Sequence, residues 1–168
     1  MQSVLRGPPA PKLAGLCNTS FDGYPTVDPL TLPATLESLE PLVQYVLSAA
    51  AEAGLDRKAS YRLRLAVDEI ATNIITHGYA DAHIAGDVVV NASVGDEQLV
   101  ITLEDWAPPF DPRDQEAEPD HIDKPSHERP IGGLGVYLAF QSVDGLEYEY
   151  RDNKNRNILT MNLTRAEA

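Results

Sequence analysis

Residues 67–78, VDEIATNIITHG, lie in a stretch with the pattern of an amphipathic helix, yet they carry three polar side chains in a line. Glu69, Asn73 and His77 are spaced by four, so at 100° per residue they form one nearly axial ridge. A carboxylate beside an apolar stripe is costly unless it has a partner or a chemical role. The ridge is therefore a candidate site. The alternative is that Glu69 is a solvated flank and that Asn73 bonds locally.

The apolar stripe beside this ridge predicts a helix from about Arg57 to Tyr79. Its members recur at helical spacing: Leu63, Ala66, Val67, Ile70, Ala71 and Ile74. An earlier helix is predicted from Leu39 to about Ala53, with Ser38 as its N-cap and Gly54 at its end. Pro41 then falls in the first turn, where a missing N–H costs little.

The remaining periodic segments have the character of strands. They are a short strand near residues 30–32, a hairpin of residues 87–94 and 98–104 around Gly95-Asp96-Glu97, and a hairpin of LEYEYR and NILTMNL around Asp152–Arg156. Between the hairpins, GGLGVYLAFQSV predicts a glycine turn opening a helix, and Pro108–Pro130 predicts a mobile loop. This order predicts an α+β fold, a two-layer sandwich of a mostly antiparallel mixed sheet with helices on one face.

Composition limits the classes of function. The chain has 168 residues, with residues 1–28 predicted as a flexible leader and residues 29–168 as one domain. Its net charge of −13 disfavours direct contact with nucleic acid phosphates. No apolar run approaches the roughly 20 residues that span a bilayer. Cys17 is the single cysteine, so a disulfide within the chain is excluded and a cytoplasmic location is expected.

Two further motifs offer chemistry. LEDWAPPFDP places Asp105 at the end of an apolar strand, where a carboxylate can accept from a ligand's amino group or cap a turn, and Phe110 offers an aromatic face. IGGLGVYLAF places Gly132, Gly133 and Gly135 at a helix start, where backbone N–H groups favour an anion. Many such glycine pairs are only turns, so this motif alone is weak.

The order of these motifs resembles the histidine-kinase-like ATPase (GHKL, Bergerat-fold) superfamily. VDEIATNIITHGYA is similar to its N box, DWAPPF to its first glycine box and GGLGVYLAF to its second. The resemblance covers roughly residues 30–163. The small size and the wording of the N box point to the anti-sigma-factor serine/threonine kinases within it.

The resemblance implies ATP or ADP and Mg²⁺ as ligands, with Glu69 as general base and Asn73 holding the metal through its amide oxygen. Mg²⁺ keeps waters and phosphate ligands, so one asparagine from the protein can suffice. A base one helical turn away is placed to deprotonate a hydroxyl near the γ-phosphate. His77 is expected to pack or cap near the helix end.

The resemblance also implies that Asp105 accepts from the adenine amino group, that amides at Gly133 and Gly135 meet the phosphates, and that Thr160 supports the adenine site through water. The first glycine box departs from the family pattern, because Ala107 and Pro109 occupy glycine positions. The shape of the adenine-side wall is therefore open.

The function implied by the resemblance is a protein kinase that acts as an anti-sigma factor in transcription regulation and stress response. It would phosphorylate a STAS-type anti-anti-sigma protein and sequester a sigma factor, without contacting nucleic acid or membrane. The relatives also imply a homodimer. Residues 111–131 are expected to form a lid over the nucleotide. The alternative is a regulatory module that binds nucleotide and partner without transferring phosphate.

Overall fold

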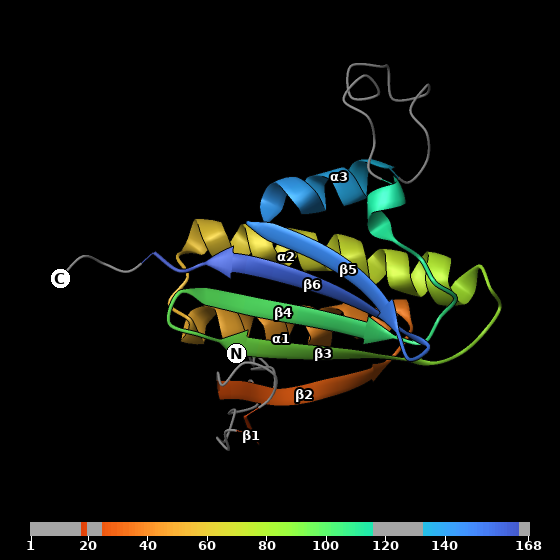
Figure 1. Ribbon diagram of the computed structural model, residues 1–168, viewed down its shortest axis with the longest axis horizontal. Coiled ribbons are helices and arrows are strands. Elements are labelled where there is room, and N and C mark those ends of the chain that lie inside the picture. Colours follow the sequence, from red (N-terminus) through yellow and green to blue (C-terminus); the bar gives the residue numbers. More distant parts are fainter. Residues whose placement is uncertain (1–17, 20–24, 116–132, 165–168) are drawn as a thin grey trace, which may run out of the picture.

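The computed structural model describes residues 18–19, 25–115 and 133–164 of the chain. Its sheet has six strands in the order β1-β2-β3-β4-β6-β5 (Figure 1). The strands are β1 (Asn18–Thr19), β2 (Pro25–Pro33), β3 (Asp87–Val94), β4 (Gln98–Asp105), β5 (Gly145–Arg151) and β6 (Lys154–Asn162). Every pairing among these strands is antiparallel, so the expectation of a mixed sheet is wrong in that respect.

Helices cover one face of this sheet (Figure 1). They are α1 (Leu39–Glu52), α2 (Arg57–Asn73) and α3 (Gly133–Ser142), with the short segments η1 (Leu36–Ser38), η2 (Ile74–Ala80) and η3 (Pro112–Gln115). The α1 and α2 helices pack on the sheet, and α3 packs beside α2. The predicted α+β two-layer sandwich is therefore confirmed.

The side chains of β4 and β6 alternate between the helix layer and the open face. In β4, Leu99, Ile101, Leu103 and Asp105 are buried toward the helices. Their direct partners in β6 are Met161, Leu159, Asn157 and Asn155, which are also buried. Since side chains alternate with a period of two, this register decides which β6 residues can reach Asp105.

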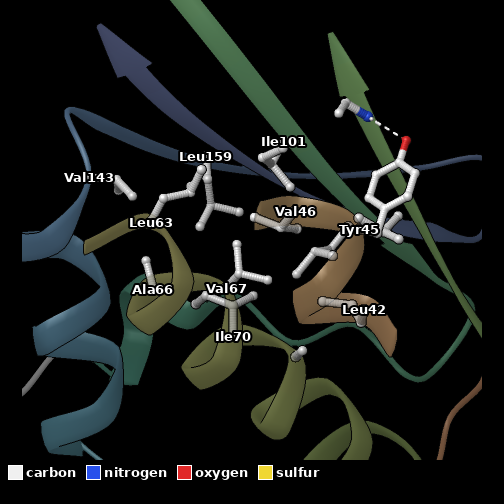
Figure 2. Packing of buried hydrophobic residues seen from close by; sticks show 14 of the residues in the cluster. Leu42, Tyr45, Val46, Leu63, Ala66, Val67, Ile70, Ile101, Val143 and Leu159 are labelled. Atoms are coloured by element: carbon white, nitrogen blue, oxygen red, sulfur yellow. Dashed lines mark hydrogen bonds between the residues drawn. The ribbon is translucent and has the colours of Figure 1, made fainter. Parts of the chain in front are cut away.

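The core lies between the helices and the sheet. Figure 2 shows Leu42 and Val46 of α1, together with Leu63, Val67 and Ile70 of α2, packed toward Ile101 and Leu159. Tyr45 extends to the sheet, where its hydroxyl accepts a hydrogen bond of 3.2 Å from the backbone N–H of Ala92. The helical stripe predicted from Leu63 to Ile74 is buried throughout, so α2 is fixed with its polar ridge at the edge of this core.

The start of α1 differs from the prediction, whereas α2 begins at Arg57 as predicted. Ser38 makes no capping hydrogen bond, because η1 leads directly into α1 and gives Ser38 helical dihedral angles. Asp56, which the sequence reasoning passed over, caps α2 by accepting from the N–H of Ala59 at 2.7 Å. Gly54 lies just beyond α1 with a φ of 77°, which glycine adopts at low cost.

The N-terminal segment and the last hairpin also differ from expectation. Residues 25–28 belong to β2, which pairs with β1, so the predicted leader of residues 1–28 does not hold for these strands. The last hairpin turns at Asp152 and Asn153, whose φ angles are 55° and 58°. Residues 1–17 and 20–24 of the leader, and residues 116–132 of the predicted loop and lid, lie outside the described residues.

Across residues 18–19, 25–115 and 133–164, the structure contains no helix with the length and apolar character needed to cross a membrane.

Candidate functional site

The ridge on α2 meets α3 at Glu69. A Cβ built at Gly135 would overlap a carboxylate oxygen of Glu69, so the absence of a side chain at Gly135 allows the close approach. Gly135 lies in the first turn of α3. The second glycine motif therefore lies directly against the proposed base, and residues 66 positions apart in the sequence form one wall of the site.

The environment of Glu69 suits proton transfer. The side chain is half-buried, and burial raises the pKa of its carboxyl, with a smaller contribution from the neighbouring Asp68 carboxylate. A carboxylate with a raised pKa accepts a proton more readily near neutral pH than an exposed one does. The alternative of a fully solvated flank is therefore excluded for Glu69.

Asn73 is the last residue of α2, one turn beyond Glu69 on the same ridge. It is half-buried. The helix continues beyond it as η2, in which hydrogen bonds span five residues rather than four. Such π-helical turns are rare and occur often at functional sites. The two elements together cover the whole helix that the sequence predicted from Arg57 to Tyr79 and extend one residue beyond it.

The far end of η2 packs against the first glycine-box motif. A Cβ built at Gly78 would lie 3.0 Å from the Cβ of Ala107, so the two backbones approach closely. The hydroxyl of Tyr79 accepts from the N–H of Trp106 at 2.9 Å and donates to the carbonyl of Asp87 at 2.8 Å. Gly78 thus makes room for the methyl group at Ala107, the position where the family pattern has glycine.

His77 takes part in this packing from the surface. Its ring stacks on Phe110 with the centroids 6.3 Å apart and the planes inclined by 27°. Its Nδ1 lies 2.8 Å from a carboxylate oxygen of Asp81. These contacts agree with the expected packing and capping role at the end of the helix.

Asp105 is buried at the end of β4, with 2% of its surface exposed. Its Oδ1 accepts from the N–H of Ala107 at 3.0 Å and from Nδ2 of Asn155 at 2.8 Å. Among the described residues, no hydrogen bond reaches Oδ2. Burial raises the pKa of the Asp105 carboxyl, and the bonds from Asn155 and Ala107 oppose that rise. Asp105 therefore caps a turn with one oxygen and has the other available for a ligand.

Sequence reasoning missed two buried asparagines of β6. Asn155 pairs directly with Asp105, and Asn157 lies two residues further along the same face. Oδ1 of Asn157 is buried without a hydrogen-bond partner in the described part of the chain. The sequence did carry a signal in the segment NRNILTM, residues 155–161. Every second residue of this segment faces the helices together with Leu159, and two of these inward positions, 155 and 157, hold asparagine instead of an apolar residue. The register with β4 was needed to use it.

Thr160 does not join these residues. It pairs with Val100, five residues before Asp105, and five is an odd number, so the two side chains lie on opposite faces of the sheet. Thr160 therefore does not lie beside Asp105 as the resemblance implied. The β6 residues on the same face of the sheet as Asp105 are Asn155, which pairs with it directly, and Asn157, which pairs with Leu103.

The second glycine motif begins the helix rather than preceding it. α3 starts at Gly133, so Gly133 and Gly135 both lie in its first turn. The first four N–H groups of a helix have no partner within the helix, and the positive end of the helix dipole lies at the same place. Gly132 lies outside the described residues.

These groups fit an adenine nucleotide with Mg²⁺. Within the described residues, Oδ2 of Asp105 receives no hydrogen bond, Oδ1 of Asn157 is buried without a partner, and α3 presents backbone donors next to Glu69. Glu69 and Gly78 are nine residues apart along one helix, which spans roughly 13 Å at 1.5 Å per residue. One helix can therefore line the whole site, from the glycines of α3, where phosphates would bind, to Ala107 beside Asp105, where adenine would bind.

Comparison with known proteins agrees with this geometry. The anti-sigma F factor of Clostridium perfringens is 31% identical over 97 residues, which are 58% of this chain and 67% of the relative. The serine-protein kinase RsbW of Listeria innocua is 28% identical over 123 residues, which are 72% of this chain and 78% of the relative.

A solved structure of the RsbU and RsbW domains of Rv1364c from Mycobacterium tuberculosis shares the fold, with a TM-score of 0.54 and 21% identity. The match covers 82% of this chain and 33% of that longer chain. The histidine kinase-like ATPase domain model matches residues 32–163, which include the α2 ridge, Asp105 and the glycine turn. The chain therefore belongs to the histidine kinase-like ATPase domain family.

Proposed function

We propose that this protein is an ATP- and Mg²⁺-dependent serine/threonine protein kinase that acts as an anti-sigma factor. The observation that carries the proposal is the contact of one helix with both glycine motifs, through Glu69 against Gly135 and through Gly78 against Ala107. Three motifs that are far apart in the sequence thus line a single site. Relatives named anti-sigma F factor and serine-protein kinase support the same conclusion.

Each residue has a role in this proposal. Asp105 accepts from the adenine amino group through Oδ2, and the first-turn amides at Gly133 and Gly135 donate to phosphate oxygens. Asn73 holds Mg²⁺ through its amide oxygen, and the bound ion neutralises charge on the phosphates. Glu69 takes the proton from the attacking hydroxyl of the partner's serine or threonine.

The proposed partners are proteins. We infer a STAS-type anti-anti-sigma protein as the phosphoacceptor and a sigma factor as the sequestered partner, in the cytoplasm. The net charge of −13 favours basic protein surfaces over nucleic acid.

A homodimer is part of the proposal. Light scattering at a protein concentration of tens of micromolar tests it, since a measured mass equal to that of the monomer would exclude a stable dimer.

A non-catalytic module that binds nucleotide and partner is the second candidate. Ala107 and Pro109 in place of glycines favour it, because they change the backbone next to Asp105. The presence of a half-buried carboxylate with a raised pKa at Glu69 favours the kinase, since binding alone does not require a base.

A paired measurement of ADP affinity and phosphate incorporation separates the two candidates. Purified protein is incubated with labelled ATP, Mg²⁺ and STAS proteins from the same genome. Glu69→Ala is expected to lower phosphotransfer by about 10²–10⁴ while leaving ADP affinity nearly unchanged. Asn73→Ala is expected to lower both phosphotransfer and Mg²⁺-dependent affinity.

Glu52→Ala is the matched control, because Glu52 is an exposed glutamate at the end of α1, away from the site. Equal transfer rates in the wild type and Glu69→Ala would remove Glu69 as the base. A wild type that binds ATP and partner but transfers no phosphate would favour the non-catalytic module.

A further inference from the structure

The β5–β6 hairpin places the side chain of Asn155 against Asp105. Nδ2 of Asn155 donates to Oδ1 of Asp105 at 2.8 Å and to the carbonyl of Ala107 at 2.9 Å. Oδ1 of Asn155 accepts from the hydroxyl of Tyr148 at 2.6 Å and from the N–H of Phe110 at 3.4 Å. Both amide atoms of Asn155 are thus used in full, with 3% of the residue exposed.

Backbone groups fix the orientation of this amide. The carbonyl of Ala107 can only accept, so the atom facing it must be the NH₂ group of Asn155. The N–H of Phe110 can only donate, so the opposite atom must be oxygen. Turning the amide over would break both contacts. The Tyr148 hydroxyl can donate or accept, so it does not choose the orientation, but its hydrogen bond to Oδ1 further restrains the amide.

This orientation has a consequence for the two oxygens of Asp105. Oδ1 already receives two N–H donors, from Asn155 and Ala107. Donors of this kind favour the ionised carboxylate, which has only acceptor sites. Oδ2 is then held as an acceptor, which can pair with an amino group on a base and opposes a carbonyl oxygen at the same place.

We propose that Asn155, oriented by the backbone of Ala107 and Phe110 and supported by the Tyr148 hydroxyl, is a positioning residue that keeps Oδ2 of Asp105 an acceptor and thereby sets selectivity for a base with an exocyclic amino group. This proposal deepens the proposed function and rests on its nucleotide site. Asn155 acts through Asp105 and has no direct part in phosphate transfer.

The first test is Tyr148→Phe, with ADP and inosine diphosphate as probes. Inosine diphosphate carries an oxygen where adenine carries its amino group, so the ratio of the two affinities reports on the acceptor. Loss of one hydrogen bond to Asn155 is expected to lower the preference for ADP by roughly 3- to 10-fold. A purely structural defect would weaken both nucleotides equally and leave the ratio unchanged.

Tyr150→Phe is the matched control, because Tyr150 is a 44% exposed tyrosine in the same strand. The ratio of ADP affinity to inosine diphosphate affinity in this variant is expected to equal that of the wild type. Circular dichroism of each variant confirms that the comparison is made between folded proteins.

Asn155→Asp is the second test. It places two carboxyl groups at hydrogen-bonding distance, so the pair must share one proton at neutral pH. The preference for ADP is then expected to fall and to depend on pH between 6 and 8, whereas the wild-type ratio stays flat. Calorimetric titration at three pH values measures this.

The outcomes separate this proposal from the proposed function. Unchanged ratios in both Tyr148→Phe and Asn155→Asp would overturn the role of Asn155 while leaving the kinase proposal standing. If the wild type prefers ADP but transfers no phosphate, and both variants lower that preference, the kinase proposal would be overturned and the role of Asn155 would be supported. A wild type that binds neither nucleotide would overturn both.

Discussion

Gly135 matters because it has no side chain. The space that a Cβ would need is filled by the end of the Glu69 side chain, which is flexible and can move at little cost. The carboxylate of Glu69 therefore lies where it does because α3 has no side chain at Gly135. A change at Gly135 should disturb the chemistry more than the fold.

Gly135→Ala is expected to keep or raise stability and to lose activity. Alanine in a helix is favoured over glycine by up to about 1 kcal/mol. Displacement of Glu69 by about 1 Å is expected to lower phosphotransfer about 10²-fold. Urea unfolding and phosphate incorporation measure the two effects. Gly145→Ala is the control, because its Cβ would make only an ordinary contact with Thr160. Full activity in Gly135→Ala would contradict the positioning of Glu69 by this contact.

Asn157→Leu is expected to lower the affinity for ADP and to raise the free energy of unfolding. Its buried Oδ1 has no partner within the described residues, and such a group costs about 1–3 kcal/mol. Leucine removes that cost, so the variant should unfold at higher urea, and ADP should bind more weakly because the amide is lost to the ligand. Asn91→Leu is the control, since Asn91 also has an unpaired oxygen but lies on the open face. Unchanged ADP affinity in Asn157→Leu would remove Asn157 from the site.

The residues that sequence could identify were those with a motif of their own. Glu69, Asn73 and Asp105 stand at recognisable positions along a helix and at a strand end. Asn155 and Asn157 could not be assigned, because their role depends on which β4 residue each one faces. A shift of one residue in that register would turn both to the open face, as the misplaced Thr160 demonstrates.

At the scale of elements, the turn between β5 and β6 has an unusual backbone. Asp152 and Asn153 both have positive φ, the conformation of a type I′ hairpin turn that matches the twist of the strands. Asparagine and aspartate tolerate this region better than most residues, and glycine tolerates it best. The sequence located this hairpin, but the predicted turn of Asp152–Arg156 was too long, because β6 already begins at Lys154.

Asn153→Gly is therefore expected to stabilise the protein by about 0.5–1 kcal/mol, because glycine relieves the cost of a positive φ. Asp96→Gly is the control, since Asp96 lies in the other hairpin turn and is not among the described non-glycine residues with positive φ. It is expected to be neutral or destabilising, because glycine there only adds freedom to the unfolded chain. Thermal unfolding compares the two, and equal shifts would contradict the role of φ at Asn153.

Helix lengths were predictable from periodicity, but the change from α2 to η2 was not. The stripe from Leu63 to Ile74 continues without a glycine, a proline or another break in the pattern. The wider turn of η2 arises where Gly78 and Tyr79 pack on the first glycine-box motif, which is a tertiary contact. Local sequence carries no signal for such a contact.

For the whole molecule, the site is built at the expense of stability. Asp105 is a buried carboxyl whose pKa is raised by burial. The native chain therefore holds its proton more readily than the unfolded chain does. The stability that this protonation contributes is complete below the unfolded pKa of about 3.9, and it is lost as pH rises through the folded value.

Asp105→Asn removes this dependence, because a neutral amide still accepts from Asn155 and Ala107 through Oδ1. The variant is expected to gain stability relative to the wild type as pH rises from about 4 toward neutral, and then to keep a constant advantage. Urea unfolding of both proteins across this range measures the difference. The variant should also lose most ADP affinity. Parallel stability curves would contradict the raised pKa of Asp105.

The hairpin that carries Tyr148 and Asn155 also bears on how the chain folds. These two residues are 7 positions apart, whereas Asn155 and Asp105 are separated by 50. Hairpins form within about 1–10 μs, and pairings between distant segments form more slowly because a long loop must close first. The β5–β6 pair can therefore assemble early, with the Tyr148 hydroxyl already beside Asn155. When β4 later docks beside β6, Asp105 meets a partner that is already in place.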